Sequence, residues 1–221
     1  KKFAFLQQYI ATAQFDATPV LTISLRETLA KEYYLDNKHL RYVEAKRMQG
    51  VDKILDQEGL STNLDAMFTR MNIFDNDIEL MLNRFVSPLS SSMAVSYYRY
   101  YIMDTIMVDG TSCIDLAFVP VNSQSYGFTG HLYVVNDSSY ALKKYAINVP
   151  PHINMNFVSD LSIEQEFERL PSGEWTPKEL HNYVRFYLFK KMRQVYAHQT
   201  VKYSDYQLGA TPPDTLFQGM N

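Results

Sequence analysis

Residues 109–120 read DGTSCIDLAFVP and decide the fold. The pair Asp109-Gly110 is a strong signal for a two-residue hairpin turn, because Asp and Gly tolerate the positive φ angles that such a turn requires. The residues that follow alternate in polarity, as expected of a strand with one buried face. That alternation places Ile114, Leu116 and Phe118 together on one face. This stretch therefore predicts an antiparallel hairpin whose return strand packs one side into a core.

Strand signals continue on both sides of this hairpin. Alternating or continuously apolar runs predict strands over residues 97–108, 132–135, 141–149, 161–170, 183–189 and 195–208. Turns rich in Gly, Pro and Asn separate them, and most connections are short. Short connections join neighbouring antiparallel strands, so the simplest topology is a meander. We expect a mainly β (α+β) fold with a large curved antiparallel sheet or an unclosed half-barrel.

Two helices are expected ahead of the sheet. Apolar residues recur at helical spacing over residues 60–71, among them Leu64, Met67 and Phe68. A second helix is predicted over residues 75–85 by the same criterion. An amphipathic helix needs a surface to cover, so we expect one or both helices to pack on the concave face of the sheet.

The domain organisation follows from the ends of the pattern. Residues 20–34 and 40–48 read as a hairpin about an Asn-containing turn. We expect a single domain over residues 1–208. The prolines of residues 210–213, ATPP, interrupt the strand pattern, so residues 209–221 are expected to form a linker.

Composition excludes several classes of protein. The 221 residues carry a net charge of −3 with acids and bases interspersed, which is unlike the basic stripe of a nucleic-acid binder. Cys113 is the only cysteine, which excludes an internal disulfide, and its strand context predicts a buried, unreactive thiol. No apolar stretch is long enough for a membrane-spanning helix. Because the chain begins at Lys1 without an initiator Met, we interpret it as a piece of a longer protein.

Catalytic and metal-binding patterns are not evident. The five histidines stand apart in the sequence, and no two have the i, i+4 spacing of a helical zinc site; they are His39, His131, His152, His181 and His198. The acids Glu164, Glu166 and Glu168 share one strand face, which is more typical of a solvated face than of acid–base chemistry or metal binding. We therefore predict no cofactor, no metal and no enzymatic activity.

Two short motifs resemble known sites without their context. Residues 75–77, DND, begin like a calcium loop, but Leu80 stands where the turn glycine is required. Residues 127–130, GFTG, resemble the backbone clamp of an RNA-binding KH domain, yet a strand follows where a helix is needed. We interpret the second motif as a tight turn in which each glycine takes a conformation barred to other residues.

Aromatic residues are unusually frequent, with 17 Tyr and 13 Phe. We interpret them mainly as core residues and cross-strand pairs. The alternative is a surface or cavity that holds a lipid or a sugar. An apolar surface between the sheet and the first helix would accept a lipid, an acyl chain or a partner polypeptide. The candidate ligand-lining residues are Ile114, Leu116, Phe118, Leu132, Val134, Phe186, Leu64, Met67 and Phe68.

Several blocks occur in an order typical of one family. They are RFVSPL (84–89), DG (109–110), CIDL (113–116), FVP (118–120), GFTGHLYV (127–134), NVP (148–150) and NMNF (154–157), with an upstream block over residues 24–50. In this order they resemble a domain-of-unknown-function family of Bacteroidetes outer-membrane proteins. In that family a carboxypeptidase-regulatory-like module comes first and an outer-membrane β-barrel follows.

The resemblance implies a location rather than a reaction. It places the domain at the periplasmic face of the outer membrane, with other envelope proteins and its own C-terminal barrel as partners. The order of strands, ending at residues 173–177, GEWTP, is also similar to the LolA-like lipoprotein carriers. Fold likeness carries no function by itself.

Three functions remain open from the sequence. The first is a non-catalytic module that binds an apolar ligand or a partner polypeptide. The second is a structural adaptor between the N-terminal module and the barrel. The third is an envelope glycan hydrolase using Glu164, Glu166 or Asp160, which requires two carboxylates about 5–10 Å apart in a cleft.

Overall fold

The computed structural model describes residues 24–35, 38–50, 68, 71–81, 83–90, 92–155, 158–187 and 194–210. The chain divides into two compact units: Lys1–Phe15 with Asp65–Ser204, and Asp16–Leu64 with Asp205–Asn221. The predicted bounds of one domain over residues 1–208 and a linker over residues 209–221 stay predictions.

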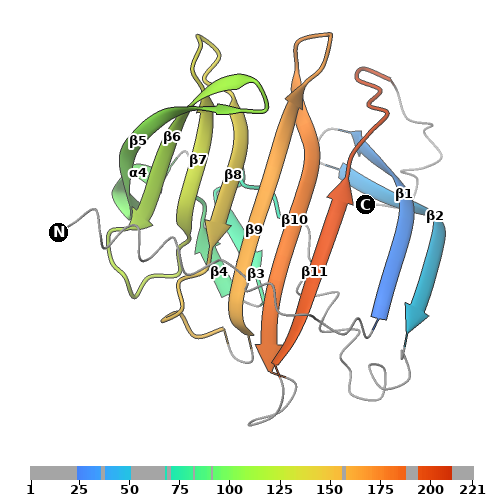
Figure 1. Ribbon diagram of the computed structural model, residues 1–221, viewed down its shortest axis with the longest axis horizontal. Coiled ribbons are helices and arrows are strands. Elements are labelled where there is room, and N and C mark those ends of the chain that lie inside the picture. The colour runs from blue at the N-terminus through green and yellow to red at the C-terminus, as the bar shows by residue number, and fades with distance from the viewer. Residues whose placement is uncertain are drawn as a thin grey trace. The chain divides into compact units, whose positions relative to one another are not determined.

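The larger unit is built on one seven-stranded antiparallel sheet (Figure 1). Its strands are β5 (Tyr98–Val108), β6 (Thr111–Pro120), β7 (Thr129–Val135), β8 (Leu142–Asn148), β9 (Val158–Arg169), β10 (Trp175–Tyr187) and β11 (Gln194–Lys202). Each strand pairs with its neighbours in the sequence, so the predicted meander is confirmed. Among the described residues β5 and β11 form the two edges and do not pair with each other, so the sheet is not closed into a barrel.

Strand register confirms the alternation from which the fold was predicted. Ile114 lies opposite Val134, Leu116 opposite Leu132, and Phe118 opposite Gly130. Directly paired residues point to the same side of a sheet, so these side chains share one face. We call this side the apolar face. The other side, which carries the acids of β9, is the polar face.

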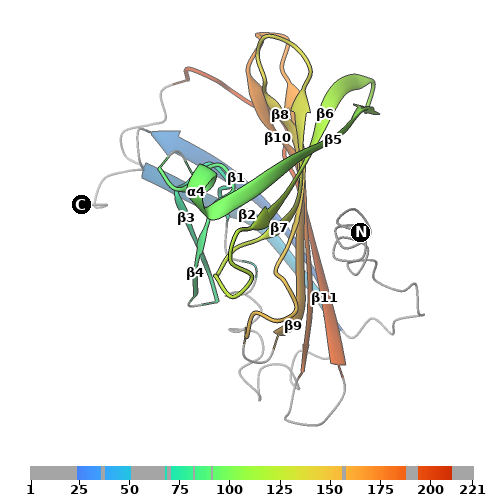
Figure 2. The same ribbon diagram turned by 90° about the vertical axis from the view of Figure 1, so that its left-hand side faces the viewer.

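A short hairpin covers part of the apolar face. It consists of β3 (Asp77–Leu80) and β4 (Asn83–Val86), which pair antiparallel. Figure 2 shows β3 and β4 on one side of the sheet, while the β5–β6 hairpin leans toward the other side. Phe85 stacks on Phe128 with ring centroids 4.9 Å apart, and the Tyr98 hydroxyl donates a hydrogen bond to the Val86 carbonyl oxygen.

The helix predicted over residues 75–85 is therefore wrong. Ile78 and Phe85 lie directly opposite each other in the hairpin and are both buried. Their spacing satisfies a helical period, but Asp77, Ile78, Glu79 and Leu80 also alternate, and packing on the sheet selects the strand. Met81 has a φ of +51° in the turn, which a helix does not allow.

Little helix is present in the described residues. The one helix there, α4 (Ala94–Tyr97), is a single turn. Of the helix predicted over residues 60–71, Leu64 and Met67 lie outside the described residues, Phe68 is a half-buried turn residue, and Met71 lies in irregular backbone. Within the described part of the chain no helix has the length and apolarity needed to cross a membrane.

The glycine motif over residues 127–130 is explained by space as much as by conformation. Gly130 has a φ of +155°, and a Cβ there would lie 2.0 Å from the Ala146 carbonyl oxygen on β8. Gly127 does not have a positive φ, so the prediction that both glycines take a barred conformation is wrong for Gly127. A Cβ at Gly127 would instead approach side-chain atoms of Pro120 and Tyr97 to 2.9 Å.

The core is filled by aromatic side chains. The largest fully buried ones are Tyr98, Tyr145, Phe85, Phe118, Phe128 and Phe186. The Tyr145 hydroxyl donates a hydrogen bond to Gln165 Oε1 at 2.8 Å, which satisfies its one donor inside the core. For these six residues the interpretation of the aromatic surplus as core packing is confirmed.

The smaller unit contains a separate hairpin of β1 (Ser24–Leu35) and β2 (Lys38–Gly50), as the sequence predicts. A bulge between Leu29 and Ala30 interrupts the register. The turn residues 36–37 lie outside the described residues. The structure also has a shallow depression of about 270 Å³ over this hairpin, lined by Glu27, Thr28, Leu29, Ala45, Lys46 and Arg47.

Candidate functional site

The apolar face contains six of the candidate ligand-lining residues. Phe118, Leu132 and Phe186 are buried by the protein itself. Ile114, Leu116 and Val134 are only half-buried. The predicted cavity between the sheet and a helix over residues 60–71 lies outside the described residues.

The half-buried residues continue onto the edge strand. Ile102 of β5 lies opposite Leu116, and its side chain is 73% exposed. Ile102, Leu116, Ile114 and Val134 therefore form a continuous apolar strip from the edge to the third strand of the sheet. We call these four residues the β5 edge strip.

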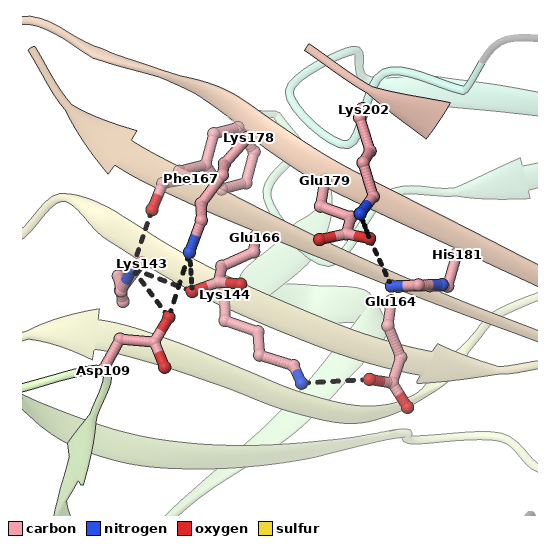
Figure 3. Close-up of polar contacts among 10 residues, drawn as sticks. All are labelled: Asp109, Lys143, Lys144, Glu164, Glu166, Phe167, Lys178, Glu179, His181 and Lys202. Atoms are coloured by element: carbon pink, nitrogen blue, oxygen red, sulfur yellow. Dashed lines mark hydrogen bonds and ion pairs between the residues drawn. The ribbon is translucent and has the colours of Figure 1, made fainter. Parts of the chain in front are cut away.

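Charged residues form a cluster on the polar face of the sheet (Figure 3). The Lys143 side chain is 6% exposed, and its Nζ donates to Glu166 Oε1 and to the Phe167 carbonyl oxygen, both at 3.0 Å. Lys178 Nζ lies 3.4 Å from Glu166 Oε1 and 3.3 Å from Asp109 Oδ2. We call Asp109, Lys143, Glu166 and Lys178 the lysine–carboxylate cluster. It ties the turn of the β5–β6 hairpin to β8, β9 and β10.

The cluster has an electrostatic consequence for Asp109. A side-chain hydrogen bond with Glu166, together with the hydrogen bond and positive charge of Lys178, lowers the pKa of Asp109 to about 2. Its pKa is 3.8 without these contacts. A carboxylate whose pKa is lower in the folded than in the unfolded state stabilises the fold above the unfolded pKa, and this contribution is lost as the pH falls through the folded pKa.

We expect this contribution to appear in acid titrations. The free energy of unfolding of the protein should fall as the pH is lowered from about 4 to about 2, and Asp109→Asn should make this fall less steep. Urea unfolding at several pH values in this window measures the slope. Glu168→Gln, which removes a carboxylate of the same strand outside the cluster, is the matched control with which the slope of Asp109→Asn is compared. An identical slope in Asp109→Asn would contradict the assignment.

Three acids of β9 are paired with cations from neighbouring strands. Glu164 lies 3.0 Å from Lys144 Nζ on β8, and Asp160 lies 3.5 Å from the Arg185 guanidinium on β10. Asp160, Glu164 and Glu166 are four and two residues apart along the strand, so they lie on one face of it. This places the acids named for a glycan hydrolase in a row of ion pairs.

Histidines come together in a way that was missed from the sequence. His181 and His198 are far apart in the sequence, but the pairing of β10 with β11 brings His181 Nδ1 within 3.2 Å of His198 Nε2. Thr200 Oγ1 lies 3.2 and 3.3 Å from these two nitrogens. Burial lowers the pKa of His198, and the charge of His181 acts in the same direction. The motifs HNY (181–183) and YAHQT (196–200) alternate, but their mutual register was not readable from the sequence.

The histidine of β7 and the cysteine of β6 also have defined surroundings. His131 and Tyr133, two residues apart on β7, stack with ring centroids 5.9 Å apart, and His131 Nδ1 lies 2.5 Å from Asp115 Oδ1. Cys113 is completely buried, and burial raises the pKa of its thiol. The prediction of a buried cysteine is confirmed.

Comparisons with known proteins identify the family of the chain. The model of a family described as "Family of unknown function (DUF5686)" matches residues 2–206, which is most of the chain. No curated protein and no solved structure matches the chain. The chain therefore belongs to the DUF5686 family, a family of unknown function.

Proposed function

We propose that this domain is a non-catalytic binding module that takes an extended, apolar polypeptide segment onto the β5 edge of its sheet. The observation that supports the proposal is the β5 edge strip, which places apolar side chains beside an edge strand. Among the described residues β5 pairs only with β6, so no other described strand occupies the second side of its backbone. A peptide that adds a strand gains main-chain hydrogen bonds from the edge and specificity from side-chain contacts.

Burial of the strip provides the driving force. Ile102 is 73% exposed, and Leu116, Ile114 and Val134 are half-buried, so each can lose further apolar surface to a ligand. Burying a large aliphatic side chain contributes about 1.5–3 kcal/mol. The aromatic side chains beneath β3 and β4 already fill the core, so the surface of the strip is the better place for a ligand than the interior.

A lipid acyl chain is the second candidate ligand. The strip offers only hydrocarbon side chains, which suit an acyl chain as well as apolar amino acids. An acyl chain cannot use the backbone groups of β5, whereas a peptide can. The peptide is therefore favoured, and the two ligands differ in whether the amides of β5 become protected.

The cellular setting belongs to the same proposal. The ordered sequence blocks support a periplasmic module of a Bacteroidetes outer-membrane protein, placed between a carboxypeptidase-regulatory-like module and a β-barrel. An adaptor that only spaces its neighbouring domains is the alternative, and it requires no ligand on the β5 edge strip.

Binding is tested with defined probes. A ten-residue peptide of alternating Val and Thr and a fluorescent fatty acid are titrated separately into ¹⁵N-labelled protein. We expect the peptide to shift and protect the amides of β5, and Ile102→Asp to weaken its binding by about tenfold or more. Val95→Asp is the control, because Val95 is a 90% exposed aliphatic residue of α4 outside the strip.

The outcomes separate the candidates. Protection of β5 amides by the peptide supports strand addition, and binding of the fatty acid without this protection supports the acyl-chain ligand. Binding of neither probe, or equal effects of the two aspartate variants, would leave the adaptor as the better explanation.

A further inference from the structure

We propose that His181 and His198 form a binding site for a divalent late transition metal of the zinc type. The register sets His181 opposite Thr200 and His198 opposite Tyr183, so the two imidazoles are diagonal neighbours on the polar face. The ring nitrogens that face each other are 3.2 Å apart, and the Thr200 hydroxyl lies within 3.3 Å of both. Three donor atoms from two strands thus meet at one point of the sheet edge.

The spacing of the nitrogens fits one metal ion. Imidazole nitrogen binds zinc at about 2.0–2.1 Å, so two neighbouring nitrogens on one ion stand about 3.0–3.4 Å apart. The ring centroids of His181 and His198 are 5.5 Å apart, so the nitrogens now point toward each other as in an N–H···N hydrogen bond. An ion replaces this hydrogen bond, and the rings tilt toward the side on which Thr200 lies. His198 is exposed on the edge strand, which leaves room for the tilt.

Two neighbouring side chains, Glu179 and Tyr183, contact the two imidazoles. Glu179 Oε1 lies 3.4 Å from His181 Nε2 (Figure 3), whereas the other ring nitrogen, Nδ1, is the one that faces His198. A carboxylate in this position holds the proton on Nε2 and directs the lone pair of Nδ1 into the site, as partners of metal-bound histidines do. Tyr183 stacks on His198 with ring centroids 4.3 Å apart and an interplanar angle of 14°, so it covers one face of the second ring.

The donor set decides the kind of ion and its role. Imidazole suits zinc, copper and nickel, whereas magnesium and calcium prefer oxygen ligands. Within the described residues no group of three His, Cys, Asp or Glu side chains gathers around one point, so the Thr200 hydroxyl and water complete the coordination. The bound ion then links the edge strand β11 to its neighbour β10. This inference does not depend on the proposed function, because the β5 edge strip lies on the opposite face.

Zinc binding to the untagged chain tests the site. Titration with ZnCl₂ in a calorimeter should show one ion per chain and a raised thermal midpoint, while MgCl₂ should show neither. Loss of a partner that only orients a ligand costs about 10–100-fold in affinity, so Glu179→Gln should weaken binding about tenfold, and His181→Gln and His198→Gln at least about 100-fold each. His131→Gln is the matched control, because His131 lies on the same face but pairs with Asp115.

A second measurement needs no variant. Zinc should protect His181 and His198 of the wild-type chain, but not His152, from modification by diethyl pyrocarbonate, as located by peptide mass spectrometry. The proposal is overturned by the absence of saturable one-to-one binding, by unchanged affinity in both site variants, or by equal loss in His131→Gln. Circular dichroism without zinc shows that each variant is folded before its affinity is compared.

Discussion

Replacing Gly130 by alanine is expected to lower the free energy of unfolding by about 4 kcal/mol or more, or to prevent folding. The new Cβ would lie 2.0 Å from the Ala146 carbonyl oxygen and 2.9 Å from the Ile147 Cα. Both are backbone atoms of β8, so relief requires β7 and β8 to separate and the ladder between them to weaken. The φ of +155° adds backbone strain for any L-residue with a side chain.

Gly110 provides the matched control for this variant. It also has a positive φ, +76°, but nothing lies within 4 Å of a Cβ built there. Gly110→Ala should therefore cost only the strain of the left-handed conformation, about 1–2 kcal/mol. Denaturant unfolding of the two variants, followed by circular dichroism, separates the clash from the strain. Equal losses in the two variants would show that the β7–β8 contact is not as close as described.

Replacing Lys143 by methionine is expected to lower the free energy of unfolding by about 3 kcal/mol. Methionine keeps most of the volume of the chain but removes the charge. The change leaves the Phe167 carbonyl oxygen without its lysine donor and takes one of two cations from Glu166. Removing one partner of a buried ion pair costs more than the pair contributes, because the remaining charge stays desolvated. Because Lys178 still contacts Glu166, the expected loss is near the lower end of the free-energy losses found when one partner of a buried ion pair is removed.

Lys178 is the control for this second variant. Its side chain is 40% exposed and contacts the same two carboxylates. An exposed ion pair contributes about 1 kcal/mol or less, so Lys178→Met should have a much smaller effect than Lys143→Met. Urea unfolding at neutral pH measures both. A larger loss of stability in Lys178→Met than in Lys143→Met would contradict the larger contribution expected of the buried Lys143.

Local pattern was enough to predict the sheet but not every element around it. The Asp109-Gly110 turn and the alternation after it depend only on residues next to one another, and both have the predicted form. Residues 77–86 satisfied two periods at once, since Ile78 and Phe85 fit a helical spacing while residues 77–80 also alternate. Contact with the apolar face decided in favour of the hairpin, and that contact is not visible in a ten-residue window.

The candidate sites were likewise only partly predictable from local sequence. The β5 edge strip was partly predictable, because Ile114 and Leu116 alternate within one strand and Val134 within the next. The exposure of the strip was not predictable, because whether a strand lies at the edge depends on the order of all the strands in the sheet. The aromatic partners of Phe118, such as Tyr98, could be expected in a core but not assigned to it individually.

The sequence by itself determined a β-rich meander with a buried cysteine, because strand period, turn residues and short connections are local properties of the chain. Tertiary structure alone decided which distant side chains meet. Asp109 reaches Lys178 across 69 residues, and His181 reaches His198 only through the β10–β11 register. A shift of one residue in that register would move one imidazole to the other face of the sheet. Register is fixed by the packing of the whole apolar face, so no short stretch of sequence contains it.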